Sequence, residues 1–581
     1  MSNKDLVIEL GQGSYSLDYN LLIHRHNIII RGQGSAKTFL NVPINIGMIG
    51  DSIINLKGDF GEEISVAISG LTLNAMVDKD QAQAANHDLT QKETYLVKCC
   101  HAKSVIIRDV KMRIENLAST CVDIRRGFNI DIRGCEFKNY NRRWTGGGIW
   151  LRGDIENVII EDNDFYKYGN DELIAIFNTN NFEGVNTSEE ISKKNVEIRY
   201  NRFYCQDDNG GQNIDSIITE TGDRGTWDGC NQRFIAVYTN QDSNKVKNAL
   251  DEIVLSSTPC HQAINGIHFY NNEFHINAPL SHLFTAAFDK YTTFKDIAFR
   301  NNTIDYAGWT VEGSSSNFKE LMDFCVFYDT GYASELDGDY DGFSEEPFYI
   351  TGNTITCGSN IRNVRTKNGI QFYVDNHIIV DFKGTKVFFN KNTVICTREE
   401  YTSDEQSYAN KGVEVFHCGG KGGEIVFSNN HCEGIKSLIC WNSAGSPITL
   451  GRSWGCGNYL QGDPRITHIN ILECHDSMLS NEIIADYPIF FLEEFANTGT
   501  AQFIGNRVYR DISRATYFTT PWGHIYYTGT TGSNNNIQSM RLVSCDNVFD
   551  NLMMQNMYSY LQSGTMRTIH KSNVFADLYE S

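Results

Sequence analysis

Short stretches in which apolar and polar residues alternate recur along most of this chain. Each begins with an apolar residue, carries asparagine three positions later and ends on another apolar residue, as in FNKNTV at 389–394. Weaker copies with another residue in the asparagine position begin at Ile68, Ile107 and Ile132. The alternation has a period of two and the copies are rich in Val, Ile and Phe, so they predict β-strands rather than helices. Copies with asparagine or its closest equivalents lie at 160–165, 198–203, 269–274, 299–304, 350–355, 389–394, 427–432, 503–508 and 544–549.

The spacing of these copies predicts a repeat architecture. Most copies follow one another at 25 to 51 residues, with two longer gaps, from 201 to 272 and from 430 to 506. We expect each long gap to contain a degenerate copy, at Val237–Asn240 and at Ile471–Cys474. Strands this short cannot bury their apolar side alone and must stack on the next repeat, which predicts a parallel β-helix. Asparagine suits its turns because it tolerates the left-handed backbone region and because stacked asparagines can hydrogen-bond along the stack.

The segment IRGQGSAKT at 30–38, followed by the repeated coils, resembles the pectin-lyase-like superfamily of right-handed parallel β-helices over roughly residues 5–550. The resemblance implies an all-β, single-stranded solenoid in which asparagine marks the turn between the second and third strands of each coil. The superfamily contains polysaccharide lyases, glycoside hydrolases, epimerases and trimeric phage tailspikes. The resemblance therefore specifies the fold but not the reaction. On this basis we expect a lead-in and first strand at 1–27, the β-helix at 28–550 and a C-terminal cap at 551–581.

Composition limits the classes of partner that this chain can bind. The net charge of −21 argues against nucleic acid or an anionic membrane as a partner. No apolar run approaches the roughly eighteen residues of a membrane span, and the N-terminus lacks the pattern of a signal peptide. The 16 cysteines are not spaced like a disulfide scaffold. Cys205, Cys357 and Cys396 each follow the motif asparagine by four residues, so we expect reduced thiols in an inward stack.

A row of cations is predicted on the first strands, which precede the motif by ten to fifteen residues and form the glycan-binding face in related enzymes. Asp123, Asp154 and Glu172 offer counterions, which gives a salt-bridge ladder on a solvated sheet as one interpretation. The other interpretation is a row of subsites for an acidic polysaccharide, with Trp150 as a sugar-stacking surface. Period-two alternation places four cations outward at equivalent positions of successive coils: Lys57, Lys98, Arg125 and Arg152.

Two chemistries fit such a face. A lyase must neutralise a uronate carboxylate, remove a proton and protonate the leaving oxygen, roles that Arg125 and Arg152 could share, often with Ca²⁺. A hydrolase needs two carboxyl groups flanking the scissile bond. The polygalacturonase motif set and the pectate-lyase WIDH motif are absent, so neither mechanism is carried over. The hydrolase candidates, which are also ordinary turn residues, are Asp207, Asp208 and Asp215, then Glu220, Asp223 and Asp228, with Trp227 as a further sugar contact.

One stretch has the opening of a calcium loop. In DGDYDGFSEE at 337–346, Asp337, Asp339 and Asp341 alternate and a glycine follows, which is the D-x-D-x-D-G pattern. Position twelve is Phe348 rather than glutamate, so a solvated acidic loop is the alternative to a structural Ca²⁺. Cys99, Cys100 and His101 make only a weak metal pattern, since no CxxC accompanies them.

The expected function is that of a carbohydrate-active β-helix that binds and cleaves a polysaccharide. The first hypothesis is a bacteriophage tailspike in the virion tail, a homotrimer contacting other tail proteins. The alternatives are a non-catalytic receptor-binding or structural tail protein, and a bacterial lyase or hydrolase, secreted or periplasmic, whose leader is absent.

Overall fold

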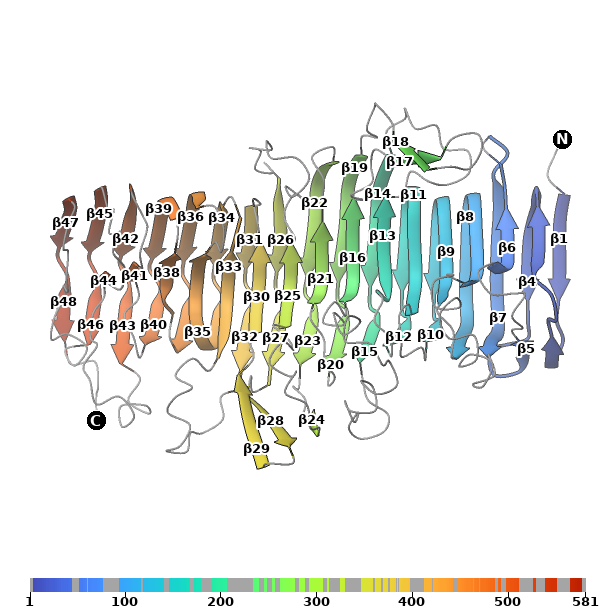
Figure 1. The fold of residues 1–581 in the computed structure, drawn as a ribbon, viewed down its shortest axis with the longest axis horizontal. Coiled ribbons are helices and arrows are strands. Elements are labelled where there is room, and N and C mark those ends of the chain that lie inside the picture. Colours follow the sequence, from blue (N-terminus) through green and yellow to red (C-terminus); the bar gives the residue numbers. More distant parts are fainter. Residues whose placement is uncertain are drawn as a thin grey trace. The chain divides into compact units, whose positions relative to one another are not determined.

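The chain is built from parallel strands wound into successive coils (Figure 1). Within the ranges given below, no helix has the length and hydropathy needed to cross a membrane. The computed structural model describes residues 4–43, 52–59, 61–76, 94–115, 119–139, 146–167, 172–178, 191–205, 233–239, 245–247, 253–255, 262–276, 282–287, 292–306, 311–312, 324–329, 346–358, 361–366, 369–374, 377–382, 384, 386–397, 412–420, 422–442, 447–462, 464–469, 471–485, 490–492, 498–510, 526–528, 539–550 and 565–576.

Unit 1 comprises Met1–Ala298 with two short later segments, Trp309–Ser316 and Arg365–Asn368. Each coil contributes one strand to each of three parallel sheets, and an antiparallel hairpin of β17 (Lys245–Lys247) and β18 (Ile253–Leu255) is inserted. The first sheet contains β3 (Leu21–His24), β6 (Ser52–Lys57), the first parts of β8 (Thr94–Glu115), β9 (Ser119–Arg133) and β11 (Gly146–Glu161), then β13 (Ile174–Asn178), β16 (Arg233–Thr239) and β21 (His282–Ala287). The second contains β1 (Lys4–Glu9), β4 (His26–Arg31), parts of β7 (Ile64–Met76), β8, β9 and β11, then β14 (Ile191–Arg199) and β19 (Gln262–Tyr270). The third contains β2 (Gly13–Ser16), β5 (Thr38–Pro43), the last parts of β7 and β8, then β10 (Glu136–Asn139), β12 (Asp164–Lys167), β15 (Arg202–Cys205) and β20 (Glu273–Ile276).

Unit 2 comprises Phe299–Gly308, Asn317–Val364 and Gly369–Ser581, and repeats the same plan. Its first sheet contains β25 (Phe324–Asp329), β30 (His377–Phe382), β33 (Val413–Cys418), the last part of β35 (His431–Asn442), β38 (Ile466–Ile469), β41 (Phe490–Leu492) and β44 (Tyr526–Thr528). The second contains β26 (Pro347–Thr351), β31 (Lys386–Asn390), β34 (Gly422–Ser428), β36 (Ile448–Cys456), β39 (Ile471–Leu479), β42 (Thr498–Ile504), β45 (Ser539–Cys545) and β47 (Thr565–Lys571). The third contains β23 (Thr303–Tyr306), β27 (Thr354–Cys357), β32 (Thr393–Cys396), the first part of β35, β37 (Tyr459–Gly462), β40 (Glu482–Ala485), β43 (Arg507–Arg510), β46 (Val548–Asp550) and β48 (Val574–Ala576).

These pairings confirm the predicted fold class, an all-β right-handed parallel β-helix. The motif asparagine lies between the strands of the second and third sheets, as the resemblance implied. Parallel pairing also includes residues 4–24 and 565–576, which the sequence assigned to the lead-in and to the cap.

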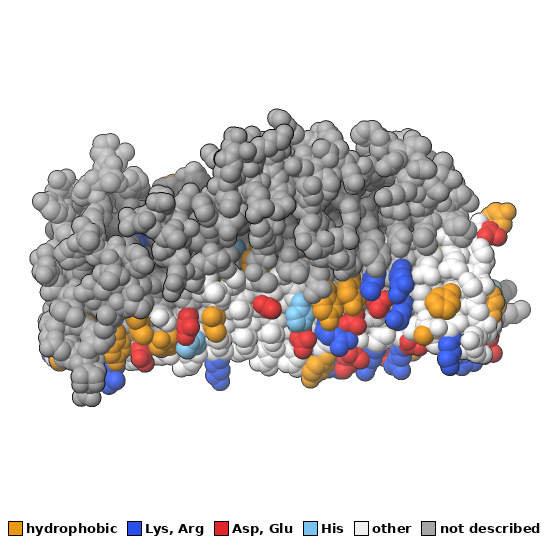
Figure 2. Space-filling view, turned by 90° about the horizontal axis from the view of Figure 1, so that it is seen from below, with side chains coloured by type: hydrophobic (Ala, Val, Ile, Leu, Met, Phe, Trp, Pro, Cys, Tyr) orange, Lys and Arg blue, Asp and Glu red, His pale blue; other side chains and the backbone are white. Residues whose placement is uncertain are grey.

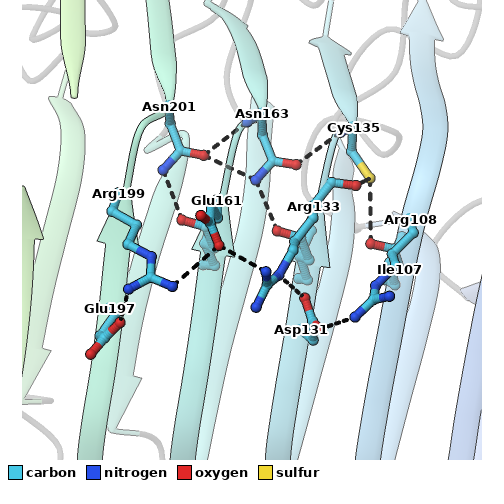
Figure 3. Close-up of polar contacts among 12 residues, drawn as sticks. Ile107, Arg108, Asp131, Arg133, Cys135, Glu161, Asn163, Glu197, Arg199 and Asn201 are labelled. Carbon is cyan, nitrogen blue, oxygen red and sulfur yellow. Dashed lines mark hydrogen bonds and ion pairs between the residues drawn. The ribbon is translucent and has the colours of Figure 1, made fainter. Parts of the chain in front are cut away.

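The motif asparagines form a buried ladder. In unit 2, the side-chain NH₂ of Asn392 donates to the carbonyl of Ile350 at 2.9 Å and to Asn430 Oδ1 at 3.3 Å, and the Asn392 backbone N–H donates to the same Oδ1 at 2.9 Å. In unit 1, Asn163 makes equivalent bonds to Asn201 (Figure 3). The predicted stacking of asparagines is confirmed, and each rung satisfies backbone groups that the turn would otherwise leave unpaired.

The predicted left-handed conformation belongs to a different residue. It is the residue immediately before the ladder asparagine that has positive φ, as at Asp162 (53°), Tyr200 (55°) and Lys391 (56°). The ladder asparagines themselves are not among the described residues with positive φ. Their amide is therefore required for its hydrogen bonds rather than for backbone freedom.

The two degenerate copies expected in the long gaps are wrong. Asn201 N–H donates directly to Asn272 Oδ1, so this gap is one coil with insertions, and Val237 lies on the first-sheet strand β16. In the second gap the ladder runs through Asn458 and Asn481 instead of Ile471–Cys474. An insertion lengthens the first gap without adding a rung, whereas short coils of 28, 23 and 25 residues place two rungs in the second gap, so spacing alone does not count coils.

Inward side chains stack in columns. Phe137, Phe165, Phe203 and Phe274 lie ring on ring at 4.6 to 4.9 Å in unit 1. Cys357 and Cys396 occupy one buried column with Tyr306, and Cys205 pairs with Ile276. These cysteines are free and buried, which confirms the predicted inward thiol stack.

The outward side of the second sheet in unit 1 is a charged network (Figure 3). Arg133 contacts Asp131 at 2.6 Å and Glu161 at 3.0 Å, and Arg199 contacts Glu161 at 3.3 Å and Glu197 at 2.7 Å. Figure 2 likewise shows positive and negative side chains interleaved on the face drawn there, rather than gathered by sign. Opposite charges on neighbouring rungs are the cross-strand pairs that stabilise such a sheet.

Candidate functional site

The predicted row of cations on the first sheet of unit 1 is only partly a row. Arg125 pairs with Arg152, and Cys100 and Lys57 precede them in the same column. Lys98 instead pairs with Asp123, one outward position away. The expectation that Lys98 occupies the equivalent position is therefore wrong, because the residue paired with Lys57 is Cys100, 43 positions later, rather than Lys98, 41 positions later.

Asp123 is the centre of this cluster. It is completely buried, and its two carboxylate oxygens contact Arg125 Nε at 2.6 Å and Arg152 Nε at 2.9 Å. Burial lowers the pKa of the Arg125 guanidinium, but the charges of Asp123, Tyr95 and Cys100 and the hydrogen bond to Asp123 together hold the pKa above its ordinary value. A buried carboxylate shared by two guanidinium groups favours the salt-bridge interpretation of these residues.

Trp150 does not offer an open sugar-stacking surface. Its side chain is 3% exposed, because the Arg152 guanidinium lies 4.5 Å from the ring centroid and Tyr95 packs edge-on at 6.3 Å. Tyr95 also lies beneath Arg125, at 5.2 Å. Aromatic faces already covered by guanidinium groups stabilise the ion pairs through cation–π contacts.

The remaining predicted residues divide into two groups. Glu172 is described and is buried just before β13, and Asp154 contacts Arg126 at 3.7 Å. Cys99 is buried, which raises the pKa of its thiol far above the ordinary value. Among the described residues Cys99, Cys100 and His101 form no metal-ligand group. The candidates outside the described residues are Asp207, Asp208, Asp215, Glu220, Asp223, Trp227, Asp228, Asp337, Asp339 and Asp341.

A second cluster lies on the first sheet of unit 2. Asp381, His417 and Cys440 follow one another on adjacent rungs, in β30, β33 and β35. His417 Nδ1 lies 3.1 Å from Asp381 Oδ1, and the two side chains are 24% and 13% exposed. The contact leaves an imidazole held by a carboxylate at a position that solvent reaches. This pairing fixes the tautomer in which Nδ1 carries the proton and Nε2 carries the lone pair.

Glu414 completes this cluster, which we call the acid–imidazole centre (Asp381, Glu414, His417 and Cys440). Glu414 is 5% exposed, three residues before His417 on β33. One donor atom each from Glu414, His417 and Cys440 lie within 4.8 Å of one another. Carboxylate, imidazole and thiolate are also a ligand set that zinc accepts, so the same residues could hold a metal ion.

Another group of the same residue types is enclosed within unit 2. His468 Nε2 lies 2.6 Å from Asp476 Oδ2, Cys474 Sγ lies 3.1 Å from the same oxygen, and Trp441 Nε1 donates to Oδ1 at 3.3 Å. Burial tends to raise the pKa of Asp476, but His468 and the hydrogen bonds lower it below its ordinary value. His468, Cys474 and Asp476 are all buried, so this network stabilises the core and is closed to a polymer substrate.

The sequence contains a signal for the acid–imidazole centre that the sequence prediction did not use. HIIVDF and VEVFHC precede the motif asparagines Asn392 and Asn430 at the spacing expected of first strands. Applying the alternation to these two strands places Asp381 and His417 on one side. The prediction from the sequence covered cations on four early coils. It did not include this pair of an acid and an imidazole on later coils.

Comparisons with known proteins give a distant structural likeness. No family model matches the chain, and no curated protein matches it. One similar solved structure is the catalytic domain of a GH87 alpha-1,3-glucanase variant in complex with tetrasaccharides, with 10% identity and a TM-score of 0.28. The match covers 91% of this chain and 64% of that chain, so this chain spans less than two thirds of its length. No family assignment follows from these comparisons.

Proposed function

We propose that the protein binds and cleaves a polysaccharide, and that the reaction takes place at the acid–imidazole centre of unit 2. The observation that carries this proposal is the Asp381–His417 contact of 3.1 Å beside Glu414 on the first sheet. Cleavage of a glycosidic bond requires one group that removes a proton and one that supplies it. Solvent-accessible His417 and largely buried Glu414 provide two such groups within a few ångströms.

In this proposal Asp381 accepts a hydrogen bond from His417 Nδ1, and His417 Nε2 acts as the base. For a uronate polymer, Nε2 takes the proton next to the carboxylate, the bond to the leaving oxygen breaks, and protonated Glu414 supplies that oxygen with a proton. For hydrolysis by direct attack of water, the base and the acid must lie about 6.5–9.5 Å apart, whereas the donor atoms of Glu414 and His417 lie within 4.8 Å. This geometry supports elimination, and the product of the reaction tests it.

The narrower hypotheses remain proposals that rest on the sequence. They are an acidic substrate, a tailspike in the virion tail, a homotrimer and contacts with other tail proteins. A structural Ca²⁺ at Asp337, Asp339 and Asp341 and catalytic acids at Asp207, Asp208 and Asp215 are proposals of the same kind. The rivals are a binding-only tail protein and a bacterial lyase or hydrolase.

The test is a cleavage assay on a panel of acidic and neutral polysaccharides. Ultraviolet absorbance of unsaturated ends detects elimination, and a reducing-end assay detects either reaction. We expect His417→Gln and Glu414→Gln to lose about 100-fold or more in rate with unchanged melting. His431→Gln is the matched control, because His431 Nε2 also lies against a carboxylate, Glu433, at 2.7 Å, but on the third sheet.

Two results would reject the proposal. One is a protein that binds members of the panel and leaves all of them uncut, which supports the binding-only alternative. The other is cleavage that persists at the wild-type rate in folded His417→Gln and Glu414→Gln.

A further inference from the structure

The second sheet of unit 2 presents an arginine and a large aromatic side chain to solvent on its outward face. On β36, Ser453 and Gly455 point inward, so Arg452 and Trp454 point outward. Trp454 is 53% exposed, and Arg452 is also exposed. Among the described residues of β36, β42 and β45, Trp454 is the exposed large apolar side chain.

Register extends these two residues into two parallel columns. Arg452 pairs with His475, His475 with Thr500 and Thr500 with Arg541. Trp454 pairs with Ser477, and Ser477 pairs with Gln502. With rungs about 4.8 Å apart and alternate residues about 7 Å apart along a strand, the columns span about 14 Å by 7 Å.

The cations at the two ends of this surface are Arg452, which lies opposite Glu424 on the neighbouring rung, and Arg541, which lies opposite Arg567. Within the part of the chain that the structure describes, neither Arg452 nor Arg541 makes an ion pair, and Arg541 is exposed. Glu424 already contacts Lys386 at 2.9 Å, and His475 contacts Glu473 at 2.8 Å. Arg452 beside the exposed indole, with Arg541 three rungs further along, favours an anionic ligand on this surface.

We propose that Arg452, Trp454, His475, Ser477, Gln502 and Arg541 form a binding surface for an acidic saccharide chain, which we call the second-sheet surface. The indole stacks on the apolar face of a sugar ring, and the guanidinium groups bind carboxylate or sulfate oxygens in the two-pronged geometry that arginine favours. Ser477 and Gln502 lie between them and can hydrogen-bond hydroxyl groups. The two columns run along the solenoid, which matches a linear polymer.

The chemistry of the surface disfavours other occupants. Duplex nucleic acid carries one phosphate charge about every 1.7 Å, a density that two arginines on a chain of net charge −21 do not match. The apolar members of the tryptophan column, Trp454 with half-buried Val426 and Val543, offer little of the apolar area that a stable protein interface buries. The second-sheet surface therefore fits a hydroxyl-rich, anionic chain, and the class of this ligand rests on the proposed function.

Direct binding tests the second-sheet surface. Short oligogalacturonates and oligoalginates serve as probes, neutral dextran oligomers serve as the uncharged control, and calorimetry at low and high salt gives the affinity. We expect Trp454→Ala to weaken binding about tenfold, since the loss of one stacking contact is worth about one such factor. We expect the double variant Arg452→Gln, Arg541→Gln to weaken it about as much and to flatten the salt dependence. Tyr200→Ala, at a residue 52% exposed in unit 1, is the matched control and should bind as wild type.

Three outcomes would overturn the inference. They are unchanged affinity in the folded variants, equal binding of dextran, and binding of an oligonucleotide that the same variants abolish. Cleavage is measured separately on the same proteins. A protein that cleaves but shows no effect of Trp454→Ala rejects the second-sheet surface alone, whereas one that binds through Trp454 and cleaves nothing rejects the proposed reaction alone.

Discussion

The second sheets of the two units share a backbone plan and differ in what they present outward. In unit 1, Arg133 and Arg199 are held by carboxylates on neighbouring rungs. In unit 2, Arg452 and Arg541 make no ion pair with described residues, and Arg452 lies beside an exposed Trp454. The comparison shows that a solenoid separates two tasks, because inward columns and the asparagine ladder hold the coil while outward columns are free to differ.

The largest effect is expected where unit 1 buries charge. Asp123→Ala leaves the Arg125 and Arg152 guanidinium groups without the carboxylate they share, and breaking a buried ion pair in this way costs about 3–5 kcal/mol. We expect a much lower midpoint in urea and in heat. We expect Arg452→Gln in unit 2 to leave stability unchanged. A loss similar to that of Asp123→Ala would show that the outward charges of the two units are equivalent.

A smaller, equal effect is expected in the ladder of both units. Asn392→Ala removes the bonds to Ile350 and Asn430, and Asn201→Ala removes the bonds to Ile160 and Asn272. Each variant leaves buried backbone groups unpaired, so we expect a loss of about 2–3 kcal/mol in the free energy of unfolding. Asn390→Ala, which loses one half-buried contact with Ser428, is the control and should cost less. Unequal losses at 392 and 201 would contradict the view that the inner ladder is common to both units.

The smallest effect concerns the surface network of unit 1. Glu161→Gln removes one carboxylate from between Arg133 and Arg199, in a half-buried setting. We expect at most about 1 kcal/mol, decreasing as salt rises. Unfolding of this variant at low and high ionic strength measures both features. A salt-independent loss would show that hydrogen bonding rather than charge holds the network together.

Errors in the sequence interpretation have a common physical origin. Lys98 was assigned to the column of Arg125, and hidden copies were placed at Val237–Asn240 and Ile471–Cys474, because distance along the chain was taken as distance along the solenoid. Insertions between strands break that relation while the rungs remain adjacent. Trp150 was expected to be open to sugars. It is covered by Arg152, two residues further along the same strand, and by Tyr95 from an earlier coil.

The sequence by itself determined the repeat, the parallel β-helix, the turn that asparagine marks and the inward thiol column of Cys357 and Cys396, since each depends on local alternation and on identical residues recurring. The tertiary structure decided which outward residues meet: Asp123 between two arginines, Asp381 against His417, and Arg452 in one column with His475 and Arg541. Outward contacts depend on the register between neighbouring coils, and this register changes with the lengths of the segments between strands. Local alternation does not reveal the register, because it is fixed by the stacking of buried side chains from different coils.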